Sequence, residues 1–156
     1  MAKEILVGEL LTEEMLEAGR RLLADVKQPL EVVAAFWLYF PEPEEWRLAL
    51  VTPRVDTDGP LELYTLLGDQ IYTGDERARV YGLELSNLTV LSPRDRLVEG
   101  LIDSNRNYRK AAGRDLTEQR LRGIYLDGSY VPDLYLYFIE DTPKPRRKSN
   151  GRSNVA

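Results

Sequence analysis

The sequence predicts an α+β domain, with a mostly antiparallel sheet of about 5–6 strands and three helices packed on one face. Segments with helical and strand-like hydrophobic spacing alternate along 156 residues, a length that suits one domain. Strand-like segments are adjacent near both ends, which favours antiparallel hairpins. The dipeptide Asp127-Gly128 separates the last two of them and is a strong hairpin signal.

The first elements are a helix and two strands. Residues 12–27 have the apolar spacing of an amphipathic helix, with Thr12 as the N-cap and Pro29 as the stop. Residues 31–40 and 46–51 are rich in β-branched and aromatic side chains, and an acidic turn with two prolines joins them. The first of these strands is apolar on both faces, which predicts a central strand that is covered on both sides.

The middle of the chain is expected to contain a loop, a helix and a short strand. Residues 52–59 are predicted as the loop, and Pro60 suits the first position of a helix that runs to about Tyr72. A polar, turn-rich segment follows, and residues 87–92 have the composition of a strand.

A capping box, Ser92-Pro93-Arg94-Asp95, is predicted to start the third helix. Its apolar face would comprise Leu97, Val98, Leu101 and Ile102. Residues 103–123 are basic and polar with Gly113 in their middle, so we expect a loop with a possible helical turn. In the last strand, Leu134, Leu136 and Phe138 alternate with Tyr135, Tyr137 and Ile139.

Composition excludes several kinds of chemistry. The chain has no cysteine and no histidine, so it has no disulfide, no thiolate or histidine metal site, and no Ser-His-Asp triad. No phosphate loop or dinucleotide fingerprint occurs either, and we expect no cofactor. The N-terminus lacks the apolar segment of a secretory signal, and the longest apolar run, 32–40, is too short to span a bilayer. These features predict a soluble, cytoplasmic protein without a membrane partner.

The net charge of −5 conceals an asymmetry. Residues 142–156 hold five Lys or Arg and no acid, and are predicted to be a disordered basic tail. The single domain, residues 1–141, therefore has 21 − 5 = 16 bases against 26 acids. An acidic body repels nucleic acid, so any contact with nucleic acid is expected to be weak, non-specific and made through the tail.

The chain resembles a group of small, uncharacterised bacterial proteins that share a domain of unknown function. The shared pattern covers most of residues 10–140 and is carried by Trp37, Glu45-Trp46-Arg47, Thr52-Pro53, Val55-Asp56, Gly59-Pro60, Tyr64, Ser92-Pro93, Leu97, Leu101, Gly128, Asp133, Tyr135 and Tyr137. The chain departs from the pattern at 103–120, where the group often has a Thr-Gly-Pro-Gly stretch. The resemblance implies one bacterial domain, but it identifies no functional residue.

Two sets of charged residues invite catalytic hypotheses. Asp56, Asp58 and Glu62 could supply oxygen ligands, but their spacing fails the calcium-loop pattern. We expect local roles instead, with Asp58 capping the next helix, and no metal site. Glu45 and Arg47 flank Trp46 without the aspartate that a nuclease would need on the preceding strand. They are interpreted as a solvent-facing ion pair beside a tryptophan which, like Trp37, belongs to the core.

Two groups of residues are candidates for binding. The first is a basic cluster with an aromatic residue inside it, a combination that can hold phosphates and stack a base. It comprises Arg106, Tyr108, Arg109, Lys110, Arg114, Arg120 and Arg122. The simpler interpretation is a solvated, ion-paired loop. The second group is Tyr135 and Tyr137, which share one face of their strand, as a binding surface or as cross-strand packing.

No nucleophile, general base and metal set is assembled in the sequence. The leading hypothesis is therefore a non-catalytic binding or adaptor domain of a bacterial intracellular system, with a protein partner, acting through a sheet face or through 103–122. The alternative is an enzyme that uses carboxylates and magnesium and acts on nucleic acid through the basic cluster. A purely structural subunit is the third possibility.

Truncation after Asp141 is predicted to leave the melting temperature nearly unchanged. The tail has too little apolar content to bury surface against the domain. Differential scanning calorimetry of the truncated and full-length chains checks this, and a decrease of many degrees would show that the tail docks on the domain.

Overall fold

The structure is a computed structural model, and it describes residues 10–74 and 78–140; the tail and its expected disorder lie outside them. The helices are α1 (Glu13–Val26), α2 (Arg54–Asp58), α3 (Pro60–Ile71) and α4 (Arg96–Ala112), with a 3-10 turn η1 (Leu85–Asn87). The strands are β1 (Ala34–Phe40), β2 (Glu45–Val51), β3 (Tyr72–Thr73), β4 (Ala78–Arg79), β5 (Leu88–Leu91), β6 (Thr117–Leu126) and β7 (Ser129–Ile139). Among the helices of the described residues, none combines the length and apolar composition that crossing a membrane requires.

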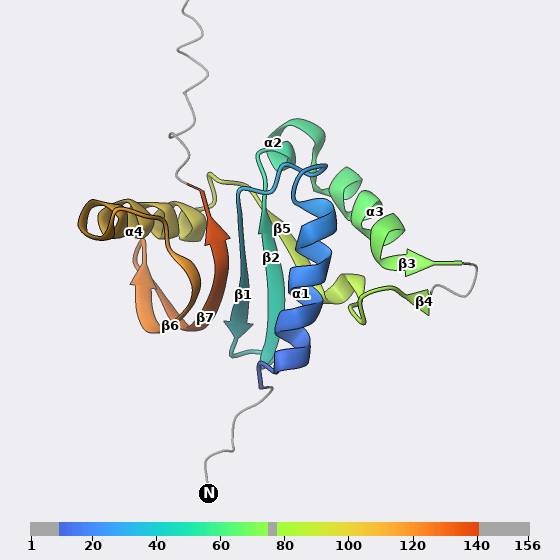
Figure 1. Cartoon of the computed structure of the whole chain (residues 1–156), viewed down its shortest axis with the longest axis horizontal. Coiled ribbons are helices and arrows are strands. Elements are labelled where there is room, and N and C mark those ends of the chain that lie inside the picture. Colours follow the sequence, from blue (N-terminus) through green and yellow to red (C-terminus); the bar gives the residue numbers. More distant parts are fainter. Residues whose placement is uncertain (1–9, 75–77, 141–156) are drawn as a thin grey trace, which may run out of the picture.

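The fold is α+β, as expected, but its main sheet is mixed and not mostly antiparallel (Figure 1). Five strands lie in the order β5-β2-β1-β7-β6, and a separate small sheet contains β3 and β4. β5 runs parallel to β2, while the other neighbouring strands of the main sheet are antiparallel. A parallel pair needs a long crossover connection, and the segment with α2, α3 and the small sheet provides it. The prediction missed this because neighbours in sequence were assumed to pair.

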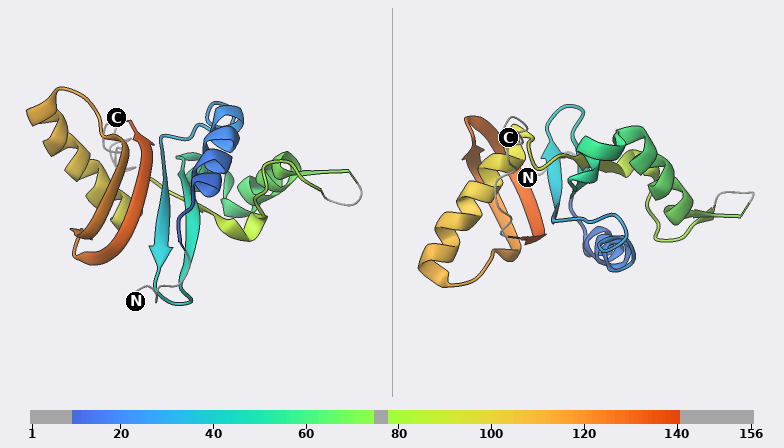
Figure 2. Two further views of the ribbon diagram at one scale, coloured as in Figure 1. Left: turned by 60° about the horizontal axis from the view of Figure 1, so that its bottom comes forward. Right: turned by 90° about the horizontal axis from the view of Figure 1, so that it is seen from above.

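Helices cover both faces of the sheet, so the expectation of helices on one face is wrong. α1 and α3 pack on one side with the buried Trp37 and Leu48, and α4 packs on the other with Phe36 and Leu136. Figure 2 shows α4 and α1 on opposite sides of the strands. The central strand β1 contributes to both cores, which confirms the interpretation of its doubly apolar sequence.

The expected loop at 103–123 is mostly regular structure. Helix α4 continues to Ala112, because its buried face, Val98, Leu101, Ile102 and Asn105, keeps helical spacing under a polar outer surface. Gly113 ends the helix in the left-handed conformation, with φ of 78°. Asn105, although polar, is fully buried: its amide donates to Asp115, and its oxygen accepts from the backbone N–H of Leu116.

Two helix starts also differ from the prediction. The expected loop at 52–59 contains the short helix α2. The N-cap of α4 is Asp95, whose side chain accepts a hydrogen bond from the Leu97 N–H, while the Ser92 hydroxyl accepts one from Arg94 N–H. Ser92 thus shapes the turn before the helix and does not cap it. Thr12 caps α1, as predicted.

The β6–β7 hairpin turns at Asp127-Gly128, as predicted, and both residues have positive φ. The register of β7 with β1 shifts between Ala35 and Phe36, and Tyr137 is the extra residue of this bulge. Leu136 and Ile139 therefore pack on the α4 side, whereas Phe138 packs on the α1 side. The strict alternation expected along β7 is correct up to Tyr137 and wrong after it.

The Tyr137 hydroxyl joins three elements at the centre of the molecule. It accepts a hydrogen bond from Trp37 Nε1 on β1 and donates one to the Leu16 carbonyl on α1, each at 2.7 Å. The ring is 4% exposed, and burial raises the pKa of this hydroxyl. A Cβ atom at Gly19 would lie 2.2 Å from the Tyr137 oxygen, so this contact requires glycine on α1.

We predict opposite effects of alanine at two helical glycines. Gly19→Ala should lower the free energy of unfolding by about 1–3 kcal/mol, because α1 must move away from Tyr137. Gly68→Ala on α3 is the matched control: its Cβ atom would meet only Leu85, at 3.9 Å. This variant should gain about 0.5–1 kcal/mol from helix propensity. Urea denaturation measures both, and equal effects would contradict the role given to the Tyr137 contact.

Candidate functional site

The fold divides the predicted basic cluster between two sides of the sheet. Arg106, Arg109 and Lys110 lie on the last turns of α4. Arg120 lies on β6, and its guanidinium is 5.6 Å from the ring of Trp46, which belongs to the core on the α1 side. Because α4 covers the other face, these residues do not form one phosphate-binding surface.

Several residues of the α4 part have partners within the protein. Arg106 pairs with Asp103 at 3.6 Å, and Arg109 pairs with Asp115 at 2.9 Å. The Asn105 amide and the Arg109 guanidinium lower the pKa of Asp115. Tyr108 is half-buried against the α4 core, and the Arg114 guanidinium lies 5.7 Å from its ring. Tyr108 is therefore packed and covered, which opposes its predicted role in stacking a base.

Two ion pairs and a tyrosine form a surface on the α1 side of β6 and β7, which we call the ribbon face: Arg20, Glu118, Arg120, Asp133 and Tyr135. Arg20 reaches from α1 to Glu118 with hydrogen bonds of 2.9 and 3.3 Å. The Tyr135 hydroxyl donates to the same carboxylate at 2.5 Å. Arg20 and Tyr135 lower the pKa of Glu118, while desolvation and Glu118 raise the pKa of Tyr135.

Aromatic rings support both arginines of the ribbon face. Arg120 makes two hydrogen bonds to Asp133, at 2.9 and 2.7 Å, above Trp46. Arg20 lies 5.9 Å from the ring of Tyr137. Of the two tyrosines predicted to bind, only Tyr135 reaches the surface, since Tyr137 is buried. Arg122 approaches Asp133 at 3.7 Å and lies at the border of the ribbon face.

The acidic candidates have local roles. Asp58 pairs with Arg54 at 2.6 Å and does not cap α3, whose N-cap is Gly59. The Asp56 carboxylate accepts a hydrogen bond from the Ser92 hydroxyl. Within residues 10–74 and 78–140, no three acidic side chains are grouped so that they could hold a metal ion.

Glu45 and Arg47, at the start of β2, form the ion pair beside a core tryptophan that the sequence predicted. Glu45 and Arg47 form an ion pair with partly exposed side chains. Trp46 and Trp37 are both buried in the core on the α1 side. The Arg47 guanidinium also lies 4.9 Å from the ring of Phe40, so the pair packs on the sheet.

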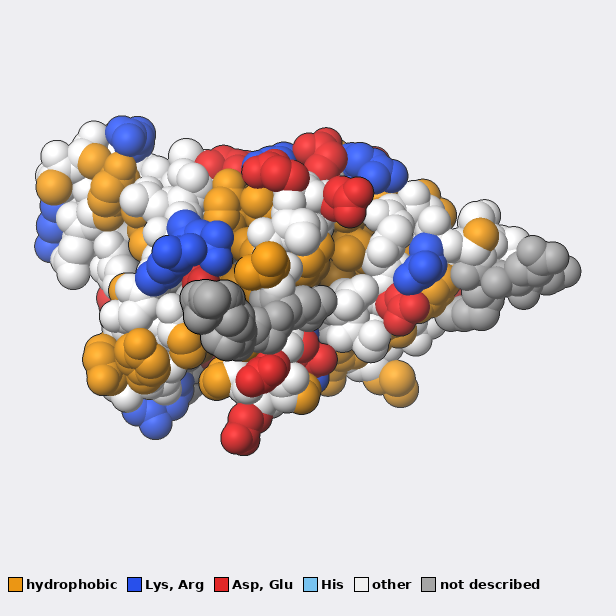
Figure 3. Space-filling model, turned by 90° about the horizontal axis from the view of Figure 1, so that it is seen from below, with side chains coloured by type: hydrophobic (Ala, Val, Ile, Leu, Met, Phe, Trp, Pro, Cys, Tyr) orange, Lys and Arg blue, Asp and Glu red, His pale blue; other side chains and the backbone are white. Residues whose placement is uncertain are grey.

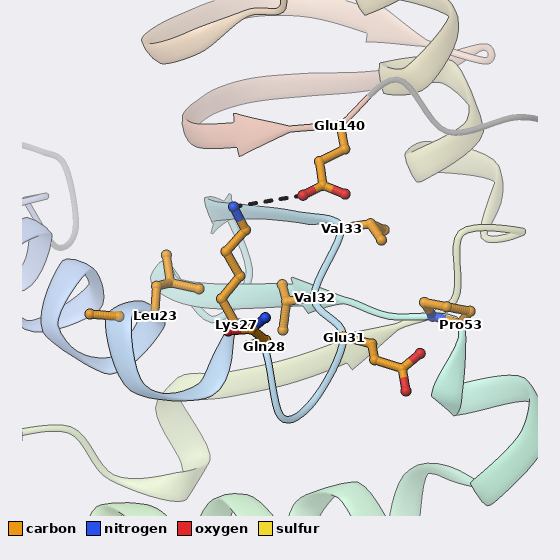
Figure 4. Close-up of a pocket in the computed structure, with 9 residues that line it drawn as sticks. Leu23, Lys27, Gln28, Glu31, Val32, Val33, Pro53 and Glu140 are labelled. Atoms are coloured by element: carbon orange, nitrogen blue, oxygen red, sulfur yellow. Dashed lines mark ion pairs between the residues drawn. The ribbon is translucent and has the colours of Figure 1, made fainter.

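A pocket of about 610 Å³ lies at the C-terminal end of α1, and we call it the end-of-helix pocket (Figure 4). It was not predicted from the sequence. Its apolar wall includes Leu23, Val32 and Pro53, and its charged groups are Lys27, Glu31 and Glu140. The volume lies within the range typical of small-molecule sites. No local motif could have revealed it, because its walls come from α1, the loop before β1, the start of α2 and the end of β7.

Two exposed tyrosines mark the end of the β6–β7 hairpin. Tyr125 is 70% exposed and Tyr130 is 57% exposed, and their rings are 5.2 Å apart. Figure 3 shows hydrophobic side chains gathered at this end of the molecule. Tyr125 and Tyr130 are partners across the two strands, so their rings pack as a cross-strand aromatic pair.

The protein is thus an α+β domain with a mixed sheet covered by helices on both faces, a paired ribbon face and a separate pocket. No family model, no curated protein and no solved structure matches the chain. The resemblance to a group of uncharacterised bacterial proteins therefore stays a prediction.

We predict that Glu118→Gln lowers the free energy of unfolding at neutral pH but not at acidic pH. The pKa of Glu118 is lowered in the folded protein from its ordinary value of 4.5. The stability that the carboxylate contributes is therefore fully present above that value, and it is lost as pH falls through the lower pKa of the folded state. Because Glu118 and Arg20 are both partly exposed, we expect Glu118→Gln to lower the free energy of unfolding by less than about 1 kcal/mol at pH 7.

The measurement is urea denaturation of the wild type and the variant between neutral and acidic pH. The two free energies of unfolding should converge as pH falls below the ordinary pKa of glutamate. Glu99→Gln, in the first turn of α4, is the control for loss of an exposed carboxylate. A difference that persists unchanged in acid would show that packing, and not the charge of Glu118, stabilises the domain.

Proposed function

We propose that this protein is a non-catalytic binding domain that contacts a protein partner through the ribbon face. The observation that carries the proposal is the paired arrangement of Arg20 with Glu118 and of Arg120 with Asp133, around Tyr135 and above buried rings. Tyrosine, tryptophan and arginine are the residues most enriched at the energetic centres of protein interfaces.

The fixed positions of the Arg20 and Arg120 side chains favour binding. Arg20 and Arg120 are held by carboxylates and by ring contacts before any partner arrives. Each therefore loses less side-chain entropy on association than a free arginine would. Hydrogen bonds to charged groups also fix the direction in which the remaining donors point.

The charges of the ribbon face indicate the chemistry of its partner. Its two arginines and two acids neutralise each other, so a charged group at the centre of a partner would gain little and would lose hydration. The proposed partner surface is apolar at its centre, with uncharged hydrogen-bonding groups that meet Tyr135 and the arginine edges. This differs from nucleic acid, whose affinity for proteins depends on phosphates.

The alternative, a magnesium-dependent enzyme that acts on nucleic acid, rests on the basic side chains of α4. Arg109 is engaged by Asp115, and Tyr108 is packed against the core, so less of this surface is available for phosphates and bases than the sequence indicated. We expect DNA and RNA to bind weakly at physiological salt, and the tail-less chain not to bind them.

The test begins with capture of partners from a native lysate on the immobilised full-length chain. A captured protein is purified, and its Kd is measured for the wild type, Arg120→Ala and Tyr135→Ala. We expect each variant to weaken binding about 30-fold or more, the effect of losing an interface residue worth about 2 kcal/mol. The melting temperature of each variant establishes that it is folded.

The matched control is the double variant Lys110→Ala with Arg114→Ala on the α4 side, which should bind the partner like the wild type. The ribbon face would be refuted as the binding site if the control variant lost binding of the partner while Arg120→Ala and Tyr135→Ala kept it. Nucleic acid that binds the tail-less chain, and is released by Arg109→Ala with Lys110→Ala, would instead support the alternative function.

A further inference from the structure

The end-of-helix pocket combines an apolar wall with acids on two sides. Figure 4 shows Lys27 extending from the end of α1 toward Glu140, while Glu31 lies on the side of Pro53. Leu23 and Val32 are buried beneath the pocket, and Val33 and Pro53 provide more exposed apolar surface. Small-molecule sites place a few charged groups beside apolar surface to fix the orientation of the ligand, and this pocket has both kinds of surface.

The charge of the pocket favours a cation. Its lining includes two carboxylates and one ammonium group, and the C-terminal end of helix α1 adds a partial negative charge. An adjoining hollow shares Glu31 and also contains Arg54 and Asp58. Asp58 at 2.6 Å and the carbonyl of Pro29 at 2.9 Å accept hydrogen bonds from Arg54 there, and the Glu31 carboxylate also stabilises its charge.

The protein itself shows how an alkylammonium group fits near Glu140. The Lys27 ammonium lies 3.6 Å from the Glu140 carboxylate and 4.2 Å from the centre of the Phe138 ring. This is carboxylate and cation–π recognition of a primary amine. The pair is long and both side chains are 48% exposed, so it contributes little stability and a competing amine can replace Lys27.

Glu31 stands where the backbone favours another residue. Its φ is 56°, in the left-handed region, at the turn that follows α1. Residues other than glycine, asparagine and aspartate seldom adopt this conformation. The sequence thus places a carboxylate beside the pocket at a conformational cost, and Glu31→Gln removes its charge while leaving that cost in place.

From these observations the geometry points to a short aliphatic diamine as the ligand of the end-of-helix pocket. One ammonium group would bind at Glu140, beside Phe138, and replace Lys27. The methylene chain would cross the apolar surface of Val33 and Pro53, which lie between the two carboxylates in Figure 4. The second ammonium group would bind at Glu31. This site is independent of the proposed partner on the ribbon face.

The experiment uses the full-length chain and a matched series of five-carbon probes: cadaverine, pentylamine, pentanol and pentanoate. Cadaverine should raise the melting temperature by about 3–6 °C at tenfold above its Kd, and calorimetric titration should give a saturable isotherm and that Kd. Pentylamine should bind more weakly, and pentanol and pentanoate should give no saturable isotherm. Raising the salt concentration should weaken the binding of cadaverine.

Variants separate the two ends of the site. Glu140→Gln and Glu31→Gln should each lower the affinity for cadaverine about two- to fivefold, toward the affinity for pentylamine. Lys27→Met should raise the affinity for cadaverine by a similar factor. Glu99→Gln, on α4, is the control that should change nothing. Absence of a saturable calorimetric isotherm with cadaverine, stronger binding of pentanoate, or loss of cadaverine binding in Lys27→Met would overturn the proposal.

Discussion

The buried hydroxyl of Tyr137 is the interaction on which the arrangement of the domain depends. A buried polar group is tolerated only when its hydrogen bonds are made, and this hydroxyl satisfies that requirement by joining β7 to β1 and α1. The absence of a side chain at Gly19 lets α1 approach the ring. Three elements that are distant in sequence are therefore held in one relative position.

Tyr137 also determines which side of the sheet Phe138 occupies. Tyr135 and Tyr137 lie on the α1 side, where Tyr135 contacts Glu118. Because Tyr137 is the extra residue of the bulge, Phe138 reaches the same side and lies beside the Lys27 ammonium. Without the bulge, Phe138 would turn to the α4 side. The ring beside the end-of-helix pocket thus depends on this irregularity in the sheet, whereas the position of Tyr135 on the ribbon face does not.

The two surfaces differ in physical character. On the ribbon face, charges are paired and rings lie beneath them, so recognition there would depend on shape and on the remaining hydrogen-bond donors. In the end-of-helix pocket, acids exceed bases around an apolar wall, so recognition there would depend on the charge of the ligand. The basic end of α4 was predicted from the sequence as a candidate binding site. In the structure, Arg106 pairs there with Asp103 of the same helix, and Arg109 pairs with Asp115 in the next loop.

Local sequence determined the parts of this protein that depend on neighbouring residues: the capped helix α1, the paired strands β1 and β2, the Asp127-Gly128 turn and the doubly buried β1. Tertiary structure alone decided the parallel β5, the placement of α4 opposite α1, the bulge at Tyr137 and both candidate sites. Arg20 and Glu118, or Lys27 and Glu140, are about a hundred residues apart, and no local pattern specifies such pairs. Periodicity reports which face of an element is apolar, but which other element covers that face is decided by packing the whole chain around one core.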